Sequence, residues 1–332
     1  MNSITKKPHP SRFMSVGASA GLAAVAGLTF GCGEEKKAEA APPFTEVAVK
    51  FEQPLNAVWV ASSTVAWAVG NGGLIVQFDG TQWKKVESPT TENLLAVWGT
   101  GADSVWAVGE KGVIAVRHEG AWTATMDRRE LTLRTVAGQG PEDVWILGDE
   151  GVALRSTGGD FSDAPAPLPT RVQGLYMDAT GAGYFVGFES GVGTVTATYD
   201  GAGEWTRVVR SDTGIGSITD IWGRIEPQER VPFLWGAGTN TAGNGLLARW
   251  QDNHWNIVSE GLNRPVAVLP TDEGLWLGAS GMLIRVDLNA PDAPETYPVA
   301  GSVRDLQGVA GLLVAVGGDT DGRIWARVPD AL

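Results

Sequence analysis

The chain has 332 residues, with 45 glycines, 14 tryptophans, one cysteine and a formal net charge of −13. Its hydrophobic content of 43% excludes a disordered chain, and the single cysteine excludes a disulfide scaffold. Lys6, Lys7 and Arg12 are the only charged residues before Cys32, so the remaining chain carries −16. So acidic a chain repels phosphate backbones, and we expect no nucleic-acid partner.

Residues 1–31 have the pattern of a secretory signal: a basic start, then the uncharged run of small and apolar residues Val16–Phe30. The run is shorter than the ~20 apolar residues that a membrane-spanning helix needs. It ends at Gly31-Cys32. It resembles a bacterial lipoprotein signal, which implies that Cys32 is lipidated, with palmitate among the expected acyl chains. An ordinary secretory signal or an uncleaved anchor is the alternative.

Residues 32–43 are small, polar and end in Pro42-Pro43, which predicts a flexible tether. The lipoprotein resemblance implies the Gram-negative envelope. Because Gly33 stands where an aspartate would indicate retention in the inner membrane, it implies an outer-membrane lipoprotein facing the periplasm or the cell surface.

A repeat begins after the tether. Val65-Ala66-Trp67-Ala68-Val69-Gly70 returns as Ser104–Gly109 and as Asp143–Gly148. The glycines at 70, 109, 148 and 187 are each 39 residues apart, and weaker copies end at Gly238, Gly278 and Gly317. The sequence therefore contains seven repeat units.

Each unit holds four short strand-like runs separated by turn residues. In the second unit they are Leu94–Gly99, Ser104–Gly109, Val113–Arg117 and Trp122–Met126. A four-stranded unit of this size cannot bury its own faces, but a radial repeat can. We therefore predict an all-β fold over residues 44–330: a seven-bladed β-propeller of four-stranded antiparallel blades. A linear solenoid is the alternative.

The last unit lacks a fourth strand. Phe44–Phe51 is strand-like and precedes the first unit without a role in it. We predict that this N-terminal strand completes the last blade and thereby removes an exposed sheet edge.

The units resemble repeats of extracytoplasmic bacterial β-propeller proteins, and more distantly photosystem II assembly-factor-like and Asp-box propellers. The resemblance rests on Leu95-Ala96-Val97-Trp98-Gly99 and the Val-Trp-Ala-Val-Gly runs, and it covers residues 52–328. It implies binding or assembly roles more often than catalysis.

Nine tryptophans recur in repeat phase. They could form a carbohydrate platform, but a large ring that recurs once per blade typically packs blade against blade. We predict structural packing for this set: Trp67, Trp83, Trp106, Trp122, Trp145, Trp205, Trp235, Trp255 and Trp276.

No catalytic signature, cofactor motif or zinc pattern occurs in the mature chain. Asp319-Thr320-Asp321-Gly322 resembles part of a calcium loop, but it lacks the further ligands of a full site. We interpret Asp319 and Asp321 as an acidic hairpin turn and predict no metal and no cofactor.

The turns between second and third strands differ in length. They span three residues from Gly70 to Gly73, but six from Gly187 to Gly193 and seven from Gly238 to Gly245. Insertions in repeats often mark a binding face, although drifted surface loops are the alternative. The predicted partner contacts are Phe188, Glu189, Thr239, Asn240, Thr241 and Asn244.

These features predict a membrane-anchored, monomeric, non-catalytic scaffold that binds an envelope protein. A glycan-binding, lectin-like propeller is the second interpretation. An extracytoplasmic hydrolase with carboxylates around a central funnel, or a quinone-cofactor propeller, is the third.

Overall fold

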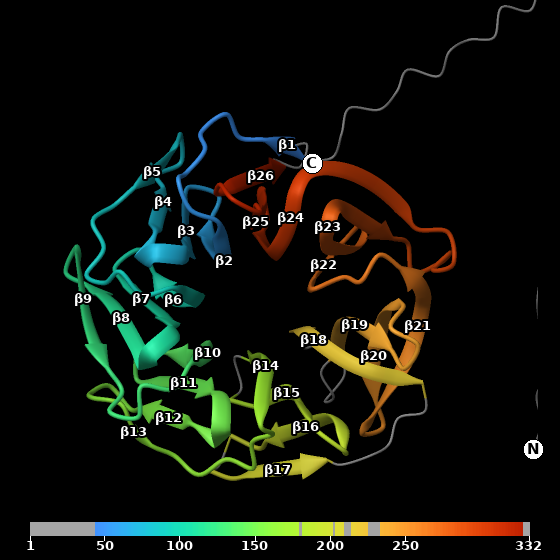
Figure 1. The fold of residues 1–332 in the computed structure, drawn as a ribbon, viewed down its shortest axis with the longest axis horizontal. Helices are drawn as coiled ribbons and strands as arrows, with labels where there is room; N and C mark the ends of the chain where they lie inside the picture. Colours follow the sequence, from blue (N-terminus) through green and yellow to red (C-terminus); the bar gives the residue numbers. More distant parts are fainter. Residues whose placement is uncertain (1–43, 179–180, 202, 209–213, 225–232, 328–332) are drawn as a thin grey trace, which may run out of the picture. The chain divides into compact units, whose positions relative to one another are not determined.

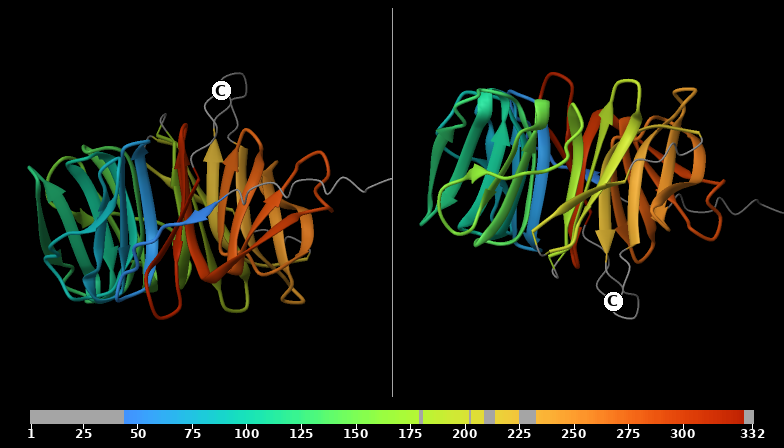
Figure 2. Two further views of the ribbon diagram at one scale, coloured as in Figure 1. Left: turned by 90° about the horizontal axis from the view of Figure 1, so that it is seen from above. Right: turned by 90° about the horizontal axis from the view of Figure 1, so that it is seen from below.

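The computed structural model describes residues 44–178, 181–201, 203–208, 214–224 and 233–327. They form antiparallel sheets arranged around a central axis, as in a β-propeller (Figure 1). Figure 2 shows this ring edge-on as a disc whose thickness is spanned by the strands. The predicted signal peptide 1–31, Cys32 and the predicted tether 32–43 lie outside the described residues.

Five sheets contain four consecutive strands each, numbered here from the axis outwards. The first comprises β2 (Leu55–Ser62), β3 (Val65–Gly70), β4 (Ile75–Phe78) and β5 (Trp83–Lys85). The second comprises β6 (Leu94–Gly101), β7 (Ser104–Gly109), β8 (Val113–His118) and β9 (Ala121–Met126). The third comprises β10 (Leu133–Gly140), β11 (Asp143–Gly148), β12 (Ala153–Ser156) and β13 (Ser162–Asp163). The fourth comprises β14 (Arg171–Met177), β15 (Gly183–Glu189), β16 (Gly193–Tyr199) and β17 (Trp205–Val208). The fifth comprises β18 (Ile215–Arg224), β19 (Phe233–Asn240), β20 (Gly245–Gln251) and β21 (His254–Leu262).

The remaining sheet, called the closing sheet below, has six strands in the order β1-β26-β25-β24-β23-β22. They are β1 (Thr45–Glu46), β22 (Ala267–Thr271), β23 (Gly274–Val286), β24 (Glu295–Val309), β25 (Leu312–Gly317) and β26 (Arg323–Arg327). Short 3-10 helices join the second and third strands of the first three sheets: η1 (Asn71–Gly73), η2 (Glu110–Gly112) and η3 (Asp149–Gly151).

The prediction of seven separate four-stranded blades is wrong, because the described residues form six sheets, five of four strands and one of six. The difference lies in β24, which runs without interruption from Glu295, paired with β23, to Val309, paired with β25. Elsewhere the sheets are separated by links of several residues, such as 86–93, 127–132 and 164–170. Between the two pairings only residues 299–301 lack a partner, because Pro298 pairs with Met282 and Ser302 pairs with Ser280, so the chain forms an irregularity within one strand and not a link between two sheets.

The repeated glycines are explained by close backbone contacts. A Cβ atom on Gly70 would lie 2.1 Å from the carbonyl oxygen of Pro54, and one on Gly109 would lie 1.9 Å from that of Asn93. These carbonyls belong to the residues just before the inner strands β2 and β6. A side chain at either glycine would therefore push the second strand away from the first.

The hydrophobic core lies between sheets. One cluster joins Val58 and Ala68 of the first sheet to Val314 and Ile324 of the closing sheet. The prediction that the repeat-phase tryptophans pack between blades is confirmed: eight of the nine are at most 8% exposed, and Trp122 is half-buried. Trp67 of β3 meets Trp122 of β9 edge-to-face, with ring centroids 5.5 Å apart.

The two ends of the described chain meet in the closing sheet. Thr45 pairs with Ala326 and Glu46 with Trp325, and the backbone N–H of Val47 donates to the carbonyl of Ile324 at 2.8 Å. The predicted pairing of the N-terminal segment with the last strand is thus confirmed. Phe44 reinforces it, since its ring is 6% exposed and lies 5.1 Å from that of Trp276.

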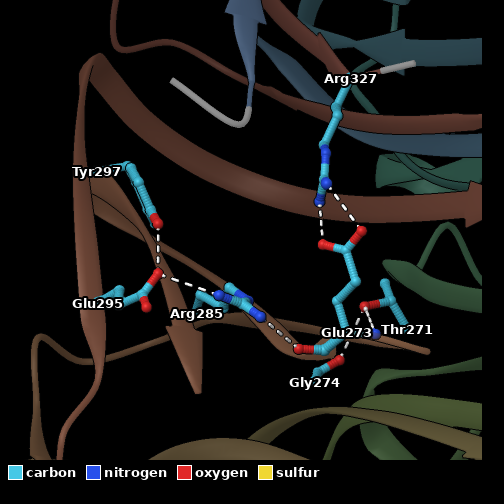
Figure 3. A network of polar contacts seen from close by, with 7 residues as sticks. All are labelled: Thr271, Glu273, Gly274, Arg285, Glu295, Tyr297 and Arg327. Carbon is cyan, nitrogen blue, oxygen red and sulfur yellow. Dashed lines mark hydrogen bonds and ion pairs between the residues drawn. The ribbon is translucent and has the colours of Figure 1, made fainter. Parts of the chain in front are cut away.

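A polar network on the closing sheet ties β26 to the β22–β23 turn (Figure 3). Arg327 donates two hydrogen bonds, of 2.7 and 2.9 Å, to the carboxylate of Glu273. Arg285 donates to the Glu273 carbonyl at 2.9 Å and to the Glu295 carboxylate at 3.2 Å. The Arg327 guanidinium lowers the pKa of Glu273, so this ion pair persists in mildly acidic solution.

Replacing Phe44 with alanine tests the closure. Phe44→Ala should lower the free energy of unfolding by about 3 kcal/mol, because it removes a buried ring that packs on Trp276. Urea unfolding followed by tryptophan fluorescence measures the change. Val49→Ala is the matched control, since Val49 lies in the same segment but is 37% exposed. Equal stability of the two variants would contradict the role assigned to Phe44.

Candidate functional site

The innermost strands enclose a cavity of about 320 Å³ at the centre of the ring. Its walls come from β2, β6, β10, β14, β18 and β24, with Val266 just before β22. Because these strands repeat one another, equivalent positions lie at similar depths. Side chains at three such positions form a polar layer, a carboxyl layer and an aromatic layer.

The polar layer contains Asn56, Arg134, Gln173, Thr219 and Arg304. Asn56 donates to the Asn71 side chain at 2.8 Å and to the Leu94 carbonyl at 2.7 Å. Arg134 makes two hydrogen bonds, of 2.6 and 2.7 Å, to the carboxylate of Asp149. Since Asn71 and Asp149 begin η1 and η3, the polar layer lies at the mouth that the second-to-third turns surround.

Arg304 is the unusual member of the polar layer. It is half-buried, and its one hydrogen-bond partner among the described residues is the neutral side chain of Asn56. Asp149 holds Arg134 in an ion pair, but no carboxylate of the described residues pairs with Arg304. A half-buried guanidinium with five N–H donors therefore keeps most of them available to a ligand.

The carboxyl layer consists of Asp220 and Asp305, both half-buried in the channel wall. Asp220 accepts a 2.9 Å hydrogen bond from the backbone N–H of Val268. Asp305 accepts bonds of 2.8 Å from Val58 and 2.7 Å from Leu306. Each carboxyl thus joins its own inner strand to the next one around the axis.

Burial raises the pKa of both carboxyls. The pKa of Asp220 rises to about 7, although the backbone donors oppose this shift. The pKa of Asp305 rises to about 8, chiefly through burial and also through the negative charge of Asp220. Both groups therefore hold their protons well above the ordinary aspartate range.

The aromatic layer contains Trp59, Trp98, Tyr176 and Trp222, with Gln307 beside them. All four rings are half-buried. Trp59 and Trp98 pack against glycines of the neighbouring inner strand. The Trp59 ring lies 2.9 Å from the position that a Cβ atom on Gly99 would take, and the Trp98 ring lies 2.9 Å from that of Gly138. The rings of Tyr176 and Trp222 are 6.2 Å apart. The rings are therefore fixed by packing, while part of each faces the channel.

The predicted contact residues Phe188 and Glu189 lie at the end of β15. They are paired with Thr194 and Gly193, so the long turn is an extension of the hairpin. Glu189 forms an ion pair with Arg207 of β17. Phe188 is 40% exposed and Val192, in the turn itself, is 42% exposed, so the tip presents apolar surface.

The other predicted contacts form the β19–β20 hairpin. Thr239 pairs with Gly245, and Asn240 pairs with Ile215 of β18. The side-chain carbonyl oxygen of Asn240 accepts hydrogen bonds from the backbone N–H groups of Ala242 at 3.0 Å and Asn244 at 2.9 Å. The backbone N–H of Thr241 donates to Gly214 at 2.9 Å. The Asn240 side chain therefore fixes the backbone of this turn, but it makes no hydrogen bond to the side chains of Thr241 and Asn244.

The acidic turn near the C-terminus is engaged by protein donors. Asp319 accepts a 2.8 Å hydrogen bond from the Ser302 hydroxyl, and Asp321 pairs with Arg323 at 3.0 Å. Within the described part of the chain, no group of three or more His, Cys, Asp or Glu side chains is placed to hold a metal ion.

Sequence reasoning did not identify the channel residues as a site. Asp220 and Asp305 occupy the repeat position held by Ala57 and Ala96 in other units, and this departure from small residues was the available signal. Trp59, Trp98 and Trp222 stand at equivalent positions of three units, but the repeat pattern does not show that they face the channel.

No protein-family model and no curated protein matches the chain. It is similar to the solved structure of YCF48 from Cyanidioschyzon merolae, with a TM-score of 0.66 and 15% identity over 87% of this chain and 100% of that one. It is also similar to the structure of YCF48 bound to D1 peptide, with a TM-score of 0.64 and 15% identity over 87% of this chain and 97% of that one. A third similar structure is the WD40 β-propeller domain of Doa1, with a TM-score of 0.65 and 10% identity over 84% of this chain and 96% of that one. At these identities the likeness establishes a β-propeller fold.

The carboxyl layer predicts a pH-dependent stability. Both pKa values lie above the ordinary 3.8, so the folded state holds the protons more tightly than the unfolded state. This stabilisation is complete below pH 3.8 and is lost as the pH rises through about 7 and 8. Because both groups are half-buried and solvent screens part of the effect, we expect the free energy of unfolding to fall by roughly 1–2 kcal/mol between pH 5 and pH 8.

Chemical denaturation across that pH range measures the effect. Asp220→Asn and Asp305→Asn should flatten the profile, because asparagine does not titrate. Asp319→Asn, in an exposed turn, should leave the wild-type slope unchanged. A wild-type profile that is already flat contradicts the raised pKa values.

Proposed function

We propose that this protein is a non-catalytic scaffold of the bacterial envelope that binds a segment of another protein at the mouth of its channel. The observation that carries the proposal is the polar layer, where Arg304 has one neutral partner and unused donors inside a rigid ring. A protein segment supplies carbonyl and carboxylate groups that such donors bind. The similar solved structure of YCF48 bound to D1 peptide supports a peptide as the kind of ligand.

The face around this mouth suits a protein partner. The Phe188 hairpin and the Asn240 hairpin are second-to-third turns, as are η1 and η3 at the polar layer. The exposed side chains of Phe188 and Val192 add apolar surface to this face. Apolar contacts beside polar groups are typical of protein interfaces.

The carboxyl layer places two carboxyl groups at the channel, as the hydrolase interpretation requires, but both take part in contacts between inner strands. A glycosidase needs one carboxyl as proton donor and another as nucleophile or base. Both oxygens of Asp305 already accept backbone hydrogen bonds, and Asp220 accepts one from Val268. These carboxyls serve the contact between inner strands, which supports a non-catalytic role.

We further propose that the ring is held at the outer membrane through lipidated Cys32. The single cysteine at the end of the Val16–Phe30 run supports this anchor. The twelve residues from Cys32 to Pro43 span at most about 40 Å when extended, so the ring stays close to the bilayer. Among the described residues there is no helical segment with the length and hydrophobicity of a membrane span.

Replacing Cys32 tests the anchor. The wild-type protein should incorporate labelled palmitate and sediment with outer membranes. Cys32→Ala should abolish labelling and move the protein to the soluble fraction, because several acyl chains are needed for stable anchoring. Ser19→Ala, in the same signal, serves as control. Sedimentation of Cys32→Ala with membranes after a carbonate wash contradicts the proposal.

Shortening the two long hairpins tests the binding face. The 187–193 and 238–245 turns are cut to the three-residue length of Gly70–Gly73. Partners are then captured by cross-linking in detergent-solubilised envelope and identified by mass. We expect at least a tenfold loss of the partner captured by wild type, on the order of 1.4 kcal/mol in binding.

Glu142→Ala, in an exposed turn between first and second strands, is the control on the opposite face. It should leave capture unchanged. Equal capture by the shortened and wild-type proteins would remove these hairpins from the interface.

A further inference from the structure

We propose that the aromatic layer of the channel binds a proline-rich, extended segment of the partner. The inference names the chemistry of the segment that the scaffold receives, and so it rests on the proposed function. It concerns side chains that are distinct from the polar layer: Trp59, Trp98, Tyr176 and Trp222.

The rings are preorganised for stacking. They come from β2, β6, β14 and β18, yet all line one cavity. Contact with Gly99 and Gly138 fixes Trp59 and Trp98, and Trp98 also packs on Trp106 at 5.5 Å. Tyr176 lies 2.4 Å from the Cβ position of Gly223. Because the neighbouring sheets hold these rings in place, a ligand need not order them, which lowers the entropic cost of binding.

The layer offers hydrogen-bond donors without charge. The indole N–H groups of Trp59, Trp98 and Trp222 make no hydrogen bond within the described residues, and neither do the Tyr176 hydroxyl and the Gln307 amide. An indole N–H can only donate. The layer itself contains no Lys, Arg, Asp or Glu, so it does not match a phosphate or an ionic side chain.

A proline-rich segment complements this chemistry. Proline lacks a backbone N–H, so such a segment presents carbonyl acceptors and apolar rings. It holds an extended polyproline II conformation before binding, and aromatic grooves recognise it through stacking and donated hydrogen bonds. A saccharide also stacks on aromatic rings, so it is the alternative ligand that the titration below distinguishes from a proline-rich segment.

Calorimetric titration of the full-length, detergent-solubilised protein tests the inference. The probes are an acetylated and amidated hexaproline peptide, a Gly/Ser peptide of the same length, and maltohexaose. We expect hexaproline to bind at least about tenfold more tightly than the other two probes.

Two channel variants locate the site. Trp98→Leu should weaken hexaproline binding about tenfold by removing a stacking surface. Tyr176→Phe keeps the ring and removes one hydroxyl donor, so binding should weaken about two- to tenfold. Because Tyr176→Phe is nearly isosteric, it keeps the test valid if Trp98→Leu fails to fold. Trp122→Leu is the matched control, since Trp122 is half-buried in the outer strand β9, away from the channel.

Absence of hexaproline binding overturns the inference, and so does unchanged affinity in Tyr176→Phe. Tighter binding of maltohexaose that depends on Trp98 would instead assign the layer to a saccharide. If a partner is captured through the long hairpins but hexaproline does not bind, the inference is wrong and the proposed function is unaffected. If hexaproline binds but partner capture does not depend on the long hairpins, only the proposed binding face is contradicted.

Discussion

The fold depends on closing the ring, because no sheet in it can bury both faces by itself. Each hydrophobic cluster draws on neighbouring sheets, as when Val58 and Ala68 pack against Val314 and Ile324. The pairing of Thr45 and Glu46 with β26 completes the last sheet with the first strand of the ring. The channel and its three layers exist only because this closure brings all the inner strands around one axis.

Much of the architecture is predictable from local sequence. The recurrent glycines mark where a second strand touches the link before an inner strand, and only a residue without a side chain fits there. The repeat-phase tryptophans were correctly interpreted as packing residues. The division into sheets was not predictable in the same way, because only residues 299–301 separate the two pairings of β24 and the strand continues through the expected boundary.

The channel was harder to predict than the strands. Asp220 and Asp305 share a repeat position, but their electrostatic coupling depends on how far the ring turns between them. Pattern also does not reveal that Arg304 bonds to Asn56, since the two residues stand at opposite ends of the repeat array. Loop length directed attention to the Phe188 and Asn240 hairpins, whereas the unused donors lie inside the channel.

The meeting of β1 with β26 also sets the order of folding. Thr45 and Ala326 are among the most distant residues that pair in this chain, so their contact has a very high sequence separation. Such contacts form late, because the entropy of closing a long loop must be overcome first. During synthesis, the first strand emerges well before its partner is available. The ring is therefore completed only when the C-terminal strand β26 is available, and until then β1 lacks its partner strand.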